Sequence, residues 1–167
     1  MFRKSTRRDE NVPQSKPVTL FGTLFLHTLL RQQEERERYR KEFAERAPRE
    51  GFEQLQVATL TFNSFVRRHF PEKPSDEQAN SFIDEMYEGV PSDLIPHRDA
   101  TPAVVQAAFE DSRGPVAGLS EPDSVSVRTH IASLMVRRLG YTEDYVCQSI
   151  VDAEKELIGE GVPLVRL

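Results

Sequence analysis

Tryptophan is absent from this chain, and cysteine occurs only once, as Cys147. A single cysteine excludes an intrachain disulfide framework. At 167 residues the chain is nevertheless long enough to bury a core without disulfides or metals. Ten phenylalanines supply large apolar side chains for that core. We expect Cys147, which follows Val146 in a helical apolar pattern, to be a small buried hydrophobe and not a reactive thiol.

A long hydrophobic run is also missing. The longest apolar stretch is Val18–Leu30, and its 13 residues fall short of the roughly 20 that a helix needs to cross a bilayer. No small-x-small cleavage pattern follows it, so it does not resemble a secretion signal. We therefore expect no membrane partner and a cytoplasmic location, which the single cysteine also suits.

Motifs that would carry chemistry are lacking as well. The eight glycines form neither a dinucleotide-binding nor a phosphate-binding loop, and no Gly-x-Ser-x-Gly nucleophile motif occurs. The four histidines share no ligand spacing with one another or with the cysteine. Paired acids such as Asp152 and Glu154 lie in helical patterns, where solvent exposure is the ordinary expectation. We predict no catalytic residues, no metal, no cofactor and no small-molecule substrate, and hence a protein that is not an enzyme.

Charge is unevenly distributed along the chain. Residues 1–17 carry five basic and two acidic side chains, a net +3, so the overall net charge of −5 leaves −8 on the remaining residues. The segment has almost no apolar content and contains two prolines, which predicts a flexible basic tail. A basic arm on an acidic body can bind nucleic acid. The residues that would make such contacts are Arg3, Lys4, Arg7, Arg8, Arg137 and Arg138.

Helical patterns dominate the rest of the chain. From position 18 to 46 no proline intervenes, which predicts one long helix that starts in the core and projects partly into solvent. Its second half carries Glu four positions before Lys or Arg, an order that stabilises an exposed helix. These pairs are Glu34–Arg38, Glu37–Lys41 and Glu42–Arg46. The same half offers a candidate protein-interaction surface: Arg36, Tyr39, Arg40 and Phe43.

Proline, glycine and capping residues mark the helices that follow. We predict helices from 52 to 70, after a capping box at Ser75–Gln78, from 101 to about 109, from 122 to 139 and after Thr142. The last six residues are predicted to form a short edge strand. The expected fold is thus all-α or nearly so, with residues 18–167 forming a single domain of about six helices.

Two stretches of the chain resemble each other at a spacing of about 70 residues. Residues 57–68 match 127–138 at five positions, and Glu-Gly-Val-Pro at 88–91 recurs at 160–163. If this is an internal repeat, two helix-turn-helix hairpins pack about a pseudo-twofold axis, and the Gly-Val-Pro segments could lie side by side. Chance similarity is the alternative.

Residues 131–167 resemble winged-helix domains in their order of helix, Gly-Tyr-Thr turn, helix and C-terminal strand. In that family the second helix reads the major groove of DNA. Here the second helix carries five acidic residues against Lys155 alone, which would repel a polyanion. Winged-helix domains also dock proteins, and an acidic second helix suits that use better.

Two functions remain open from the sequence. The long charged helix, the acidic body and the missing catalytic motifs favour a protein-interaction or assembly module, with another protein or a second copy of the chain as partner. The alternative is a nucleic-acid-binding regulatory protein that uses the basic arm together with Arg137 and Arg138.

Overall fold

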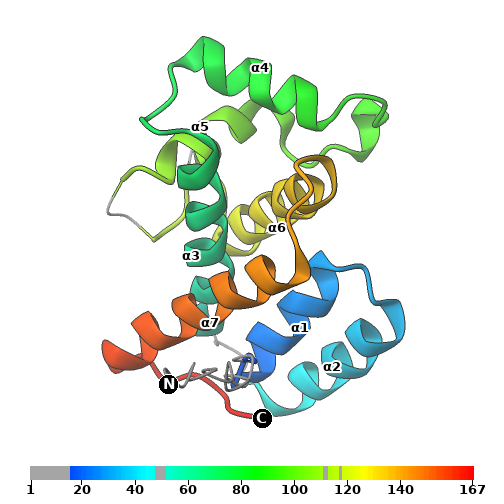
Figure 1. Ribbon diagram of the computed structural model, residues 1–167, viewed down its shortest axis with the longest axis vertical. Helices are drawn as coiled ribbons and strands as arrows, with labels where there is room; N and C mark the ends of the chain where they lie inside the picture. Colours follow the sequence, from blue (N-terminus) through cyan, green and yellow to red (C-terminus); the bar gives the residue numbers. More distant parts are fainter. Residues whose placement is uncertain (1–15, 48–51, 111–112, 117) are drawn as a thin grey trace, which may run out of the picture.

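The computed structural model describes residues 16–47, 52–110, 113–116 and 118–167 (Figure 1). Within them it contains seven α-helices and two short 3-10 helices, which confirms the all-α prediction. The α-helices are α1 (Leu20–Leu29), α2 (Gln33–Arg46), α3 (Phe52–His69), α4 (Asp76–Met86), α5 (Thr101–Ala107), α6 (Glu121–Arg138) and α7 (Glu143–Gly159). The 3-10 helices η1 (Ser92–Leu94) and η2 (Arg98–Ala100) lie between α4 and α5.

Side-chain caps begin several of these helices where the sequence predicts them. The Ser75 hydroxyl accepts a hydrogen bond from the backbone N–H of Gln78, whose side chain bonds back to the Ser75 N–H. Thr142 caps α7 by accepting from the N–H of Tyr145. Each cap satisfies backbone donors that have no partner within the helix.

The predicted single helix from 18 to 46 is wrong, because the chain reverses direction between α1 and α2. Arg31 adopts a left-handed conformation with φ of 56° in the turn. That conformation costs a non-glycine residue roughly 1–2 kcal/mol. Folding back compensates for it, since α2 then packs along α1 and the ring of Phe43 lies 5.4 Å from that of Phe21.

The ion pairs on α2 follow the prediction only in part. Glu42 pairs with Arg46 at 2.7 Å, as the spacing predicts. Glu37 instead pairs with Arg40, three positions away, at 2.6 Å. All four side chains are substantially solvent-accessible, so each pair stabilises the helix only slightly.

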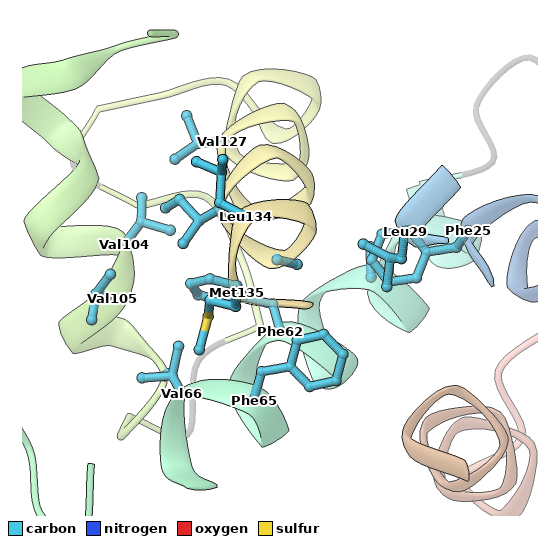
Figure 2. Close-up of a cluster of buried hydrophobic side chains, with 14 of the residues drawn as sticks. Phe25, Leu29, Phe62, Phe65, Val66, Val104, Val105, Val127, Leu134 and Met135 are labelled. Atoms are coloured by element: carbon cyan, nitrogen blue, oxygen red, sulfur yellow. The ribbon is translucent and has the colours of Figure 1, made fainter. Parts of the chain in front are cut away.

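The hydrophobic core forms around α3, which packs against α1, α6 and α7. Figure 2 shows its side chains meeting those of α5 and α6, with α1 approaching from the other side. Phe62 and Phe65 on α3 and Met135 on α6 are fully buried. Because no disulfide is available, burial of this apolar area is the main stabilising contribution.

A buried carboxylate on α7 holds the start of α1. Glu154 is 1% exposed and accepts hydrogen bonds from the backbone N–H groups of Val18 (2.9 Å) and Thr19 (3.0 Å) and from the Thr19 hydroxyl (2.5 Å). The Thr19 oxygen in turn accepts from the N–H of Gly22 (2.9 Å) and so caps α1. The expectation that Glu154 is exposed is therefore wrong, whereas Asp152 is exposed as expected.

The predicted C-terminal strand is not supported. The segment after α7 runs extended beside the start of α1. The only β-type pairing among the described residues is an isolated bridge between Thr19 and Arg166. The segment is held instead by Gln54 of α3, whose side chain donates to the carbonyl of Pro163 (2.8 Å) and accepts from the N–H of Val165 (2.9 Å). With no paired strand, the wing of a winged-helix domain is also missing from the described part of the chain.

The internal repeat is not supported either. The two similar stretches lie on α3 and α6, but the helices that follow differ in length, 11 residues in α4 and 17 in α7. α4 packs on α5, whereas α7 packs on α1 and α3. The two Gly-Val-Pro segments are far apart, because α4 and the C-terminus lie at opposite ends of the molecule (Figure 1).

Candidate functional site

A groove of about 520 Å³ lies where the turn between α1 and α2 faces α6 and η1. The turn supplies arginines, α6 supplies hydroxyls and an imidazole, and the segment after α4 supplies apolar side chains. Its lining residues are Thr28, Arg31, Arg36, Leu94, Pro96, Ser126, Thr129, His130 and Ser133. No carboxylate is among them, although the chain has more acidic than basic residues.

The α1–α2 reversal places two exposed arginines at the groove. Arg31 stands in the turn itself, and Arg36 lies in the first turns of α2. Among the described residues, no ion pair involves Arg31, Arg36 or Arg137. Their charges are thus left for a ligand or for solvent.

The end of α6 adds more positive charge. The pKa of Arg137 is lowered by partial burial and by the nearby charges of Arg31 and Arg138. Arg138 is anchored by a 2.5 Å hydrogen bond from its guanidinium to the carbonyl of Glu88. The structure therefore brings the predicted contact residues Arg137 and Arg138 together with Arg31, which the sequence did not single out.

His130 forms part of the groove wall, and its protonation is controlled by its neighbours. Burial lowers its pKa, as do the positive charges of Arg31 and Arg137. Burial also raises the pKa of Tyr87 to about 12, so its hydroxyl stays protonated. That hydroxyl lies 2.9 Å from Nδ1 of His130. A neutral His130 then accepts from Tyr87 at Nδ1 and carries its proton on Nε2.

Arg128 does not belong to this surface, although it shares α6 with Arg137. Its side chain is 2% exposed, and one guanidinium nitrogen donates to the carbonyl of Gly114 at 3.4 Å. Burial lowers the pKa of its guanidinium. It is a core residue, and the basic surface of α6 is confined to the helix end.

An apolar wall faces the arginines. Leu94 is 62% exposed, more than any other large hydrophobic residue among those described, and Pro96 lies beside it. A ligand in the groove would thus meet both positive charge and an apolar surface. That combination suits a peptide segment better than a bare ion.

The predicted interaction surface of Arg36, Tyr39, Arg40 and Phe43 is only partly exposed. Tyr39 stacks on His27 of α1 with ring centroids 5.3 Å apart, and Phe43 packs against Phe21. Arg40 is exposed and paired with Glu37, away from the groove lining. Of the four predicted residues, only Arg36 lines the groove. The basic-arm residues Arg3, Lys4, Arg7 and Arg8 lie outside the described residues.

A second hollow, of about 390 Å³, separates α3 from α7 and carries both signs of charge. Its arginines are already engaged. Arg113 bonds to Glu156 (2.8 Å) and Glu160 (2.5 Å), and Arg67 donates to the carbonyl of Ala108 (2.7 Å). Such internal pairing makes this cleft a structural contact rather than a binding site.

A third hollow, of about 420 Å³, is lined by Cys147 and His27. The imidazole Nδ1 of His27 lies 2.5 Å from the side-chain oxygen of Gln32. Burial raises the pKa of the Cys147 thiol, and so do the carboxylates of Glu143 and Asp144. A thiol held protonated in this way is a poor nucleophile, so the pair lacks the electrostatics of a catalytic cysteine.

Among the described residues, no cluster of His, Cys, Asp and Glu could hold a metal ion, and no helix has the length and apolarity to cross a membrane. Comparisons with protein-family models, curated proteins and solved structures found no significant match. Functional inference therefore rests on the groove itself.

Proposed function

We propose that the protein is a non-enzymatic interaction module that binds an acidic segment of a partner protein in the groove between the α1–α2 turn and α6. One observation carries this proposal: Arg31 and Arg36 line the groove, Arg137 lies close enough to feel the charge of Arg31, and no ion pair among the described residues engages any of the three. In a chain with 27 acidic residues against 22 basic ones, such a cluster is not explained by composition. Gathered like charges repel one another, and an anionic partner would relieve that repulsion.

The apolar wall supports a protein as the ligand. Leu94 and Pro96 offer an apolar contact beside the arginines, and specific protein contacts combine an apolar anchor with a charged rim. We propose the cytoplasm as the place of action, on the basis of the single, partly buried cysteine.

The test is fluorescence anisotropy with a short labelled peptide of glutamate and leucine residues. The double variant Arg31→Gln/Arg36→Gln should weaken binding at least about tenfold, because two charge-assisted contacts are lost. Arg40→Gln is the matched control, since Arg40 is an exposed arginine of α2 outside the groove lining. If both variants lose affinity equally, or if the double substitution leaves the affinity unchanged, the groove is refuted as the docking site.

Nucleic-acid binding is the second candidate. The closeness of Arg137 to Arg31 and Arg138 favours it, and the sequence carries further basic residues at 3–8. It predicts that a labelled oligonucleotide binds the full chain and that removal of residues 1–17 abolishes most of that affinity. Its logarithmic salt dependence should have a slope of about −0.7 to −0.9 for each phosphate contacted. Affinity unchanged by the truncation would exclude the arm.

A further inference from the structure

The polar face of α6 toward the groove consists entirely of hydrogen-bond donors. Ser126, Thr129, His130 and Ser133 follow one another at steps of one or three positions, so they form one stripe along the helix. The opposite face of α6 is buried in the core through Val127, Ile131, Leu134 and Met135. The stripe thus has one orientation, toward the groove.

From the facing wall, Arg31 and Arg36 complete the donor set. The hydroxyl of Thr28 donates to the carbonyl of Leu24 at 2.8 Å and is already used. Ser126, Thr129 and Ser133 contribute three further hydroxyls to the groove lining. The lining of one groove therefore holds two guanidinium groups, an imidazole and three hydroxyls besides that of Thr28, and the charge of Arg137 lies near Arg31 and His130.

That set exceeds what a carboxylate can use. A carboxylate offers two oxygens and one negative charge, whereas a phosphate monoester offers three terminal oxygens and nearly two charges at neutral pH. Guanidinium groups bind phosphate oxygens in a bidentate manner, and clusters of arginine are the usual feature of sites that recognise phosphorylated side chains.

We propose that the groove recognises a phosphorylated serine or threonine of the partner segment, with Arg31 and Arg36 around the phosphate, the charge of Arg137 nearby, and Leu94 beside a flanking apolar side chain. This inference rests on the proposed function, because it names the anionic group of that same ligand. The exposed leucine favours a phosphopeptide over free phosphate, which would leave Leu94 uncovered.

The test uses three labelled peptide mixtures with identical randomised flanks and a fixed central residue: phosphoserine, glutamate or serine. Anisotropy should show the phosphoserine mixture binding at least about tenfold more tightly than the glutamate mixture, and the serine mixture more weakly than both. Arg31→Gln and Arg36→Gln should each reduce the preference for phosphoserine over glutamate, while Arg40→Gln leaves it unchanged. The positions are exposed, and a far-ultraviolet circular dichroism spectrum checks that each variant is folded.

The outcomes separate the two proposals. Equal binding of the phosphoserine and glutamate mixtures overturns the phosphate inference and leaves the acidic-peptide proposal standing. If neither mixture binds, or if a labelled oligonucleotide outcompetes both in the groove, the proposed function and the inference both fail. Competition by inorganic phosphate at the concentration of the phosphopeptide would show that free phosphate is the ligand and would overturn the peptide assignment.

Discussion

Gly22→Ala is the substitution that tests most directly how α1 is held. A Cβ at Gly22 would stand 2.1 Å from Oε1 of Glu154 and 2.8 Å from the hydroxyl oxygen of Thr19. Both distances are shorter than real Cβ atoms tolerate. Because Glu154 is buried, its carboxylate has to leave its place to admit the methyl group.

The cost follows from the contacts that this movement breaks. Glu154 would lose its hydrogen bonds to the N–H groups of Val18 and Thr19 and to the Thr19 hydroxyl. Hydrogen bonds to a charged group contribute about 1.5–3 kcal/mol each, and breaking up a buried charged contact costs about 3–5 kcal/mol. The better helix propensity of alanine offsets roughly 1 kcal/mol of this loss of stability. We expect Gly22→Ala to lower the free energy of unfolding by about 2–4 kcal/mol.

Urea unfolding followed by circular dichroism measures this change. Gly159→Ala is the matched control, because Gly159 is also helical and an added Cβ there meets no atom within 4 Å. We expect that control to change stability by between zero and about +1 kcal/mol.

A double-mutant cycle identifies the cause. If Gly22→Ala acts through Glu154, then Gly22→Ala/Glu154→Ala should be about as stable as Glu154→Ala alone. Additive losses, or a Gly22→Ala variant as stable as the parent chain, would refute the steric argument.

Three further predictions concern Gln54, His130 and Cys147. Gln54→Ala should cost about 1–3 kcal/mol and speed hydrogen exchange of the Val165 amide, because both bonds from its side chain to the C-terminal segment are lost. The lowered pKa of His130 means that the unfolded chain binds its proton more readily, so stability should fall as pH drops below about 6.5, and less so in His130→Gln when unfolding is compared at about pH 7.5 and 5.5. Cys147, with its raised pKa, should react with a thiol reagent more slowly in the folded protein than in urea, and equal rates would contradict its assigned environment.

Local signals in the sequence predicted most of the helices correctly. The capping box at Ser75 and the cap at Thr142 lie where the hydroxyl and the following helical pattern indicate them. These features depend on residues only three positions apart, so the sequence contains all that is needed to find them.

The reversal between α1 and α2 had no such signal. Glycine or asparagine usually marks a left-handed residue, but here Arg31 adopts that conformation because packing of α2 along α1 outweighs the local cost. The groove was missed for the same reason. Without the reversal, Arg31 and Arg36 would belong to an exposed helix and would not lie opposite the hydroxyls and imidazole of α6.

The sequence also did not predict which charged residues are buried. Periodicity places Glu154 and Arg128 on helices. It cannot show that Glu154 accepts a hydrogen bond from the start of α1 or that Arg128 donates one to the carbonyl of Gly114. Both depend on contacts between distant parts of the chain, which a single sequence does not encode in any local pattern.

The contact between Glu154 and Thr19 also determines the order in which the protein can fold during synthesis. The two residues are 135 positions apart, so α1 leaves the ribosome long before the carboxylate that holds its start exists. Until then its apolar residues, including Phe21 and Phe25, have neither α7 nor the C-terminal segment to cover them. Such late closure of a long loop slows folding and exposes the nascent chain to aggregation. α1 therefore becomes fully packed only after α7 and the C-terminal segment have been made.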